Sequence, residues 1–250
     1  MLRRRKSKMK AGSKTRQFSK SATSGALLVA LLYAMTLVAG PVLRGLQFRD
    51  DFDSGDLSSW EFPYPEDWVI QAEGGNRFLH MLRPREPGVP RRPLQFARLK
   101  RANVGSFEFA ARVRREATSM IVVFNYVDTL HFYYAHLSVD QGTQQSVHNG
   151  LFIVNGEPRR RIAGLEAAPA LPDKDWHEVR IRRNARSGRI EVFMDGEKAP
   201  RFSVLDRTFT CGEIGIGSFA ETGDFDDIRL TSNDAGCEPG EILRPAAATQ

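Results

Sequence analysis

Acidic residues are missing from the first 49 positions of the chain, and cysteine is scarce, with two in 250 residues. Two cysteines exclude a disulfide-dense scaffold and a zinc site built from cysteine alone. Only one hydrophobic run is long enough to span a bilayer, which excludes a polytopic membrane protein. With 41% hydrophobic and 26% charged residues, the rest of the composition is that of a globular protein.

The formal charge of +6 comes from the beginning of the chain. Residues 1–20 contain nine Lys or Arg, and without them 27 basic and 30 acidic residues remain, a net of −3. The basic run is not interleaved with aromatic side chains in the way that single-strand nucleic-acid binding requires, so we expect no nucleic-acid partner. We interpret residues 1–20 as a cytosolic leader that sets membrane topology.

Residues 21–43 contain no charged side chain and predict an N-terminal hydrophobic helix. Two interpretations stay open: a cleaved signal peptide, or an uncleaved signal anchor that contacts the membrane. The basic flank keeps its own side in the cytosol, so residues after about 44 are expected outside it. The protein is therefore expected to be exported, periplasmic or extracellular, either secreted or membrane-anchored.

The remainder of the chain predicts an all-β domain over residues 44–231, followed by a C-terminal tail, 232–250. Short alternating segments are separated by turn signals such as Asn155-Gly156 and Asp195-Gly196. Many strands without a convincing helix indicate an antiparallel two-sheet β-sandwich. The twelve expected strands are Trp68–Ala72, Arg77–Leu82, Leu94–Leu99, Ser106–Arg114, Met120–Val127, His131–Val139, Gly150–Val154, Trp176–Arg183, Arg189–Met194, Arg201–Val204, Glu213–Phe219 and Phe225–Leu230.

Several motifs stand in a characteristic order: Phe48–Asp53, Tyr133–Leu137, Trp176–Ile181, Ile190–Gly196 and Gly212–Phe219. In that order and spacing the chain resembles the concanavalin A-like lectin/glucanase superfamily, and within it the laminin G-like (LamG) jelly rolls and the 3-keto-disaccharide hydrolase domains. The resemblance implies a jelly roll of two curved sheets whose concave face forms a carbohydrate groove. It also implies that the first and last strands pair at one edge.

The alternation within the strands then predicts which side chains line that groove. If Tyr133 and its alternate neighbours face the core, Tyr134 and His136 face the concave side. The alternative is that these side chains only cap the sheet. The expected carbohydrate-binding residues are Arg112, Asn125, Tyr134, His136 and His148.

Two further pairs of residues are candidates for structural roles. The implied pairing of the first and last strands would bring Asp51 near Asp227, where carboxylates could hold a structural calcium ion; the alternative is that both are ordinary surface aspartates. Cys211 and Cys237 are an even pair in the part of the chain expected to be exported, which favours a disulfide between them.

Three functions stay open at this stage. The first is a lectin-like, carbohydrate-binding domain with a glycan or glycoside ligand. The second is a glycoside-acting enzyme, a hydrolase or lyase, of the 3-keto-disaccharide hydrolase type; the third is a laminin G-like protein-interaction module. The Glu-x-Asp-x-x-Glu motif of retaining glucanases is absent, since the nearest match, Glu191–Glu197, has the wrong spacing. We interpret the basic run Arg159–Arg161 as a solvated turn rather than as a grip on an anionic glycan.

Overall fold

The computed structural model describes residues 44–141 and 148–239. The expected leader, the expected hydrophobic helix at 21–43 and the end of the tail lie outside these residues. Within the described ranges, no helix is long and apolar enough to cross a membrane.

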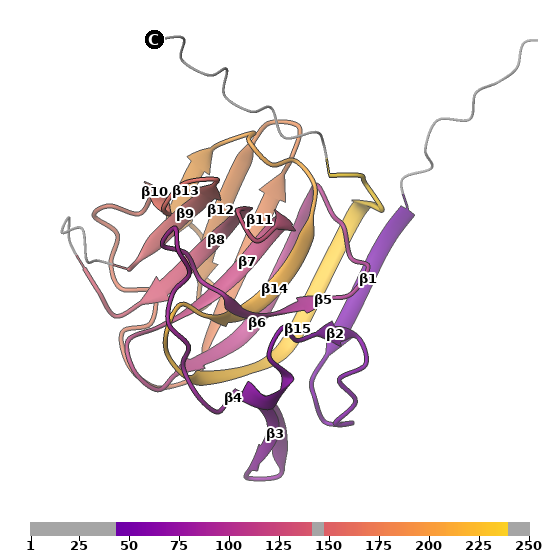
Figure 1. The fold of residues 1–250 in the computed structure, drawn as a ribbon, viewed down its shortest axis with the longest axis vertical. Coiled ribbons are helices and arrows are strands. Elements are labelled where there is room, and N and C mark those ends of the chain that lie inside the picture. The colour runs from indigo at the N-terminus through magenta and orange to yellow at the C-terminus, as the bar shows by residue number, and fades with distance from the viewer. Residues whose placement is uncertain (1–43, 142–147, 240–250) are drawn as a thin grey trace, which may run out of the picture. The chain divides into compact units, whose positions relative to one another are not determined.

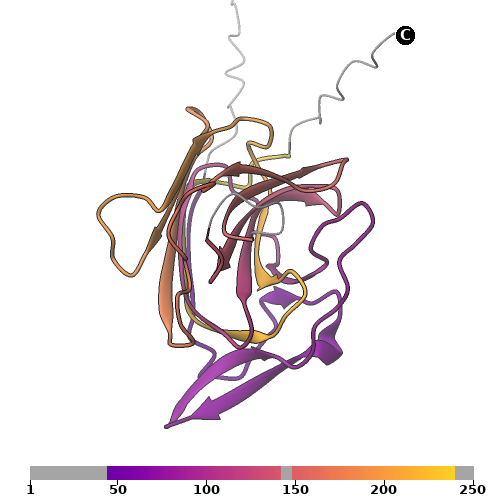
Figure 2. The same ribbon diagram turned by 90° about the vertical axis from the view of Figure 1, so that its left-hand side faces the viewer.

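The described residues form two antiparallel sheets, which Figure 1 and Figure 2 show as two layers. An eight-stranded sheet has the order β13-β12-β11-β6-β15-β4-β3, with β1 paired to β15, and a seven-stranded sheet has the order β10-β9-β8-β7-β14-β5-β2. The strands of the eight-stranded sheet are β1 (Arg44–Asp50), β3 (Trp68–Glu73), β4 (Asn76–Met81), β6 (Phe107–Arg115), β11 (His177–Asn184), β12 (Arg189–Met194), β13 (Phe202–Leu205) and β15 (Gly223–Ala235). Those of the seven-stranded sheet are β2 (Trp60–Glu61), β5 (Gln95–Leu99), β7 (Ser119–Asp128), β8 (His131–Ser138), β9 (Gly150–Asn155), β10 (Arg160–Ala163) and β14 (Glu213–Ser218).

The prediction of an all-β, two-sheet sandwich is confirmed. Each of the twelve expected strands overlaps an observed one, and three more, β1, β2 and β10, complete the sheets. One short 3-10 turn, Pro65–Asp67, precedes β3. The last strand runs to Ala235, four residues beyond the boundary expected at 231.

The main core lies between the sheets and follows the two-residue alternation of the strands. On β6, Phe107 and Phe109 point into it, whereas Glu108 is exposed on the outer face. On β8 the same rule sends Tyr133 and Leu137 inward. A single shared core between two sheets is what a sandwich of this size requires.

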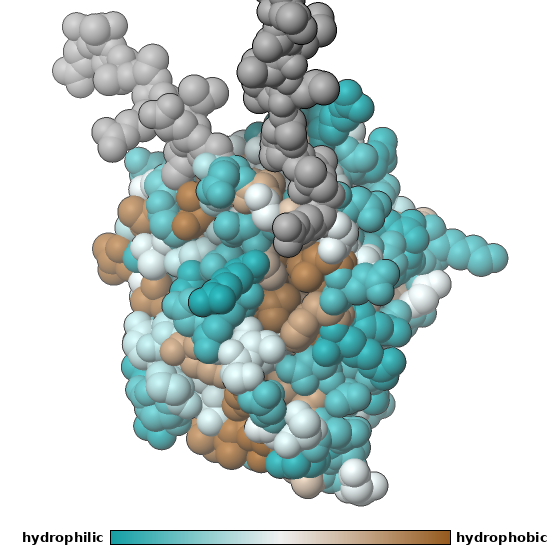
Figure 3. Space-filling model, turned by 90° about the vertical axis from the view of Figure 1, so that its right-hand side faces the viewer, coloured by the Kyte–Doolittle hydropathy of each residue, from teal (hydrophilic) through white to brown (hydrophobic). Residues whose placement is uncertain are grey.

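A second hydrophobic cluster lies on the other face of the seven-stranded sheet. Its buried members are Phe96, Ile121, Val123, Tyr126, Phe132, Tyr134, Phe152, Val154 and Phe219. Burial on both faces explains why the middle of β7 is apolar at every position. By contrast, the surface on the side of β1 carries only separate hydrophobic patches among hydrophilic residues (Figure 3).

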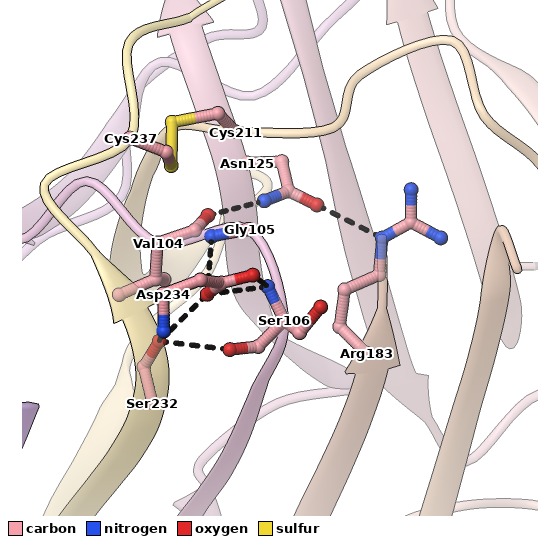
Figure 4. Close-up of a disulfide and its surroundings, with 9 residues drawn as sticks. All are labelled: Val104, Gly105, Ser106, Asn125, Arg183, Cys211, Ser232, Asp234 and Cys237. Atoms are coloured by element: carbon pink, nitrogen blue, oxygen red, sulfur yellow. Dashed lines mark hydrogen bonds between the residues drawn. A yellow bond between two sulfur atoms is a disulfide. The ribbon is translucent and has the colours of Figure 1, made fainter. Parts of the chain in front are cut away.

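The end of β15 is attached to the segment before β14 by a disulfide and to the segment before β6 by a carboxylate. Cys211 and Cys237 are bonded, with their Cα atoms 6.0 Å apart. The Asp234 carboxylate accepts hydrogen bonds from the backbone N–H groups of Gly105 and Ser106, at 3.2 and 2.8 Å (Figure 4). This end of the sandwich is therefore held by both covalent and polar contacts.

Candidate functional site

The hydrophobic cluster on the outer face of the seven-stranded sheet forms an aromatic floor. Tyr134 on β8 and Phe152 on β9 stack with ring centroids 5.2 Å apart, because these strands place them directly opposite each other. Phe132 continues the row along β8, 6.2 Å from Tyr134. Phe219, just after β14, lies 5.4 Å from His136 and closes the floor on another side. All four rings are buried, with at most 4% of their surface exposed, so they support the side chains that lie above them.

Two histidines extend the floor. The rings of His136 and His148 stack at 5.0 Å, and Nε2 of His136 lies 2.9 Å from the hydroxyl of Ser119. Burial holds the pKa of His136 well below its ordinary value, and the nearby Arg159 guanidinium adds to the effect. Burial and Arg159 also lower the pKa of His148. Both imidazoles are therefore neutral at pH 7, so each keeps one nitrogen as an acceptor.

Arg159 lies over the centre of the floor. Its guanidinium carbon is 4.5 Å from the ring centroids of both Phe152 and Phe219. Its Nη1 donates to the hydroxyl of Tyr134 at 3.1 Å and contacts Nδ1 of His136 at 3.4 Å. Buried Tyr134 and His136 thus orient Arg159 from below.

The loop at residues 82–94, between β4 and β5, brings a second guanidinium to the same floor. Buried Asp67 anchors the start of this loop by accepting hydrogen bonds from Arg85. Farther along, the carbonyl of Arg91 accepts the backbone N–H of Arg159 at 2.8 Å. The guanidinium of exposed Arg91 lies 4.8 Å from the ring centroid of Phe219.

Three of the five predicted groove residues come together, although not all in the predicted role. Tyr134, His136 and His148 lie in one cluster on the expected face of the sheet. Tyr134 and His136 have no exposed surface, whereas the side chain of His148 is 25% exposed. A ligand on this face would therefore touch His148 and the arginines, while the two buried residues position them.

Asn125 does not join the cluster, which corrects the prediction. A register shift between Phe124 and Asp128 and a positive φ of 45° at Asn125 turn its side chain the other way. Its amide donates to the carbonyl of Val104 at 2.8 Å and accepts from Nε of Arg183, on the opposite sheet, at 3.1 Å. Figure 4 shows this bridge, in which Asn125 has a structural role inside the sandwich.

Arg112 is also separated from the cluster, because β6 belongs to the eight-stranded sheet. Its guanidinium lies 5.0 Å from the ring of Trp176 and 3.8 Å from the carboxylates of Asp226 and Asp227. Burial raises the pKa of Asp226. Arg112 thus stabilises the outer face of the other sheet.

The aspartates proposed for calcium do not make a fitting site. The β1–β15 ladder brings the end of β1, where Asp51 follows, to the part of β15 that contains Asp227. However, guanidinium groups of Arg49 and Arg112 each lie 3.8 Å from Asp227, which offsets the negative charge that calcium needs. No group of three or more His, Cys, Asp or Glu among residues 44–141 and 148–239 could hold a metal ion.

Four contributors to the cluster were missed from the sequence: Arg91, Arg159, Phe152 and Phe219. Phe152 could have been found, because it alternates with Leu151 and Ile153 on a strand that was predicted. Arg159 was visible as part of a basic run but was interpreted as a turn. Arg91 lies in a loop without periodicity, so only the three-dimensional structure places it.

Comparison with known proteins shows similarity at the level of the fold. Neither a protein-family model nor a curated protein matches the sequence. Among solved structures, the carbohydrate binding module CBM66 from Bacillus subtilis is 12% identical with a TM-score of 0.51, covering 70% of this chain and 96% of its own. The GH43 protein BlXynB from Bacillus licheniformis is 15% identical with a TM-score of 0.52, covering 74% of this chain and 39% of its own. The two curved antiparallel sheets and these structural matches show that the domain has the concanavalin A-like jelly-roll fold.

Proposed function

We propose that this domain binds carbohydrate on the outer face of its seven-stranded sheet. The observation that carries the proposal is the cluster of His148, Arg159 and Arg91 above the aromatic floor. Sugar rings have apolar faces and hydroxyl-lined edges, so a ligand site needs a flat apolar surface, here the partly exposed ring of His148, together with donors and acceptors. The two guanidinium groups supply donors, and the neutral imidazole of His148, whose Nδ1 faces Asp140 at 3.3 Å, supplies Nε2 as an acceptor.

The structural matches support this proposal at the level of the fold. CBM66 is a carbohydrate binding module by name, and BlXynB is a GH43 protein. Because one fold hosts many activities, the proposal rests on the side chains of this chain rather than on the matches.

Binding is favoured over hydrolysis by the state of the nearby carboxylates. Glycoside hydrolysis normally needs two carboxyl groups that flank the bond. Asp140 lies 3.3 Å from Nδ1 of His148 and accepts the backbone N–H of the same residue at 2.9 Å. Glu221 accepts backbone hydrogen bonds from Thr118 and Ser119. Both carboxylates thus have structural partners, which suits a binding face.

We also propose that the domain works outside the cytosol, secreted or held at the membrane through residues 21–43. The uncharged segment after a basic leader supports export. The Cys211–Cys237 bond supports an oxidising compartment.

A panel of immobilised neutral and acidic glycans probed with the purified full chain tests the proposed function. We expect binding that His148→Ala weakens by about ten-fold, since it removes the exposed ring of the cluster. His131→Ala is the matched control, because His131 contacts Asp128 and Phe209 rather than the cluster. Absence of binding to every glycan, or equal losses in both variants, would refute the proposal.

A further inference from the structure

Arg159 and Arg91 differ in their partners from several other arginines on the surface of the domain. Arg85, Arg98 and Arg114 each form an ion pair with a carboxylate at 2.9 Å or less. Arg159 and Arg91, within the part of the chain that the structure describes, have no carboxylate within 4.0 Å. Arg159 is bonded instead to two neutral groups, on Tyr134 and His136.

A third guanidinium, that of Arg161, reaches the same floor. It lies 5.6 Å from the ring of Phe152, on the neighbouring strand of the sheet. Burial lowers the pKa of Arg161, and the positive charge of Arg159 lowers it further. Positive charges that lower one another's pKa repel each other. Binding of an anion between them relieves this repulsion and is therefore favourable.

The carboxylates closest to the cluster do not neutralise it. Asp140 acts on Arg161 and His148 through its field, and its Oδ2 is engaged by both the backbone N–H and the ring of His148. Glu221 is engaged by backbone N–H groups of the β6–β7 turn. Three guanidinium groups face two carboxylates, so the face keeps one net positive charge. This surplus is local, since the chain beyond residue 20 has a net charge of −3.

We infer that the ligand of this face is an acidic saccharide, whose carboxylate or sulfate group is bound by Arg159 and Arg91 while its ring lies against His148. This inference rests on the proposed function and specifies its ligand class. Guanidinium groups bind carboxylates and tetrahedral oxyanions with paired hydrogen bonds, and partial burial strengthens those bonds. The buried Tyr134 and His136 hold Arg159 in place without competing as anions.

Matched pairs of ligands distinguish the contribution of the acidic group to binding from that of the sugar ring. The probes are oligogalacturonates against their carboxyl-reduced forms, and sulfated dextran oligomers against plain dextran oligomers. Binding to the purified full chain is measured by titration at 150 mM salt, where the Debye length is about 8 Å and distant charges are screened. We expect at least one acidic member to bind about ten-fold or more tightly than its neutral parent.

Variants then assign the preference to this face. Arg159→Gln is expected to abolish the acidic preference, and Arg159→Lys to restore part of it by returning the charge without the planar fork. Arg160→Gln is the matched control, because it removes the same charge one position away. Arg160 is exposed and lies opposite Ile153, whose side chain faces the other side of the sheet from the cluster, so this substitution should have no effect. If Arg159→Gln proves unstable on heating, exposed Arg91→Gln serves as the same test.

The results test the acidic ligand and the proposed carbohydrate binding separately. Equal binding of acidic and neutral partners overturns the acidic ligand but leaves carbohydrate binding intact. An acidic preference that survives both Arg159→Gln and Arg91→Gln comes from the nine basic residues of the leader, and also overturns the inference. Failure of all glycans to bind overturns the proposed function itself.

Discussion

Removal of the Cys211–Cys237 disulfide should lower the stability of the domain without changing its native structure. The bond closes a loop with a sequence separation of 26. In the chain-entropy treatment, a loop of that length restricts the unfolded state by about 3.5 kcal/mol at 25 °C. The double variant Cys211→Ala/Cys237→Ala should therefore lose about that free energy of unfolding.

The native state should tolerate the change because both flanks have other anchors. Gly212 and Val104 exchange backbone hydrogen bonds at 2.9 and 3.3 Å beside Cys211. The N–H of Gly236 donates to the carbonyl of Asn103 at 2.8 Å beside Cys237. The effect should consequently come from the unfolded chain rather than from lost native contacts.

Urea unfolding of the oxidised protein, the reduced protein and the double variant measures this. The reduced protein and the double variant should agree, and both should show a larger m-value than the oxidised protein, because their unfolded chains are less compact. The thermal midpoint should fall by about 7–14 °C for a domain of this size. A loss below about 1 kcal/mol, or a changed native circular dichroism spectrum, would refute the reasoning.

Three further outcomes are expected. Tyr133→Phe should cost about 1–3 kcal/mol, because the hydroxyl that donates to Asp206 is lost from a fully buried ring; urea unfolding checks it, and a change within error contradicts it. Burial lowers the pKa of His177, but its hydrogen bonds to Asp195 and Asp173 outweigh burial, so the pKa is raised in the folded protein. The contribution of His177 to stability is therefore complete below the pKa of the unfolded state, and it is lost as the pH rises through the pKa of the folded state. His177→Gln should therefore flatten the fall in stability above neutral pH, and an unchanged pH profile would contradict this. Gly217→Ala should destabilise by about 1–3 kcal/mol, because a Cβ would overlap a backbone carbonyl of β5; an unchanged thermal midpoint would contradict it.

Local alternation predicted the site wherever a strand keeps its register. On β8 the ladder to β9 is regular from His131 to His136, so Tyr134 and His136 fall on the face that the pattern predicted. On β7 the irregularity after Phe124 reverses Asn125. A bulge leaves no mark in the hydrophobic pattern, because both faces of β7 are apolar at this point.

The rest of the site depends on long-range topology. The sequence around Arg112 does not show which of the two sheets β6 joins. The sheet is set by the pairing of β6 with β11 and β15, which lie far away in the chain. Arg91 reaches the floor only because the loop at 82–94 returns across the sheet and bonds to Arg159. Loops carry no periodic signal from which such contacts could be read.

The pairing of the first and last strands has a mechanical consequence. Arg44 lies opposite Ala235, and from there β1 is bonded to β15 alone, along the edge of its sheet. Tension applied between Arg44 and Ala235 would act at one end of the ladder and break its hydrogen bonds one after another. It would not load all of them at once, as shear along the strands would. Strand β1 should thus detach first under load, while β15, which is also paired to β6, keeps the sandwich closed.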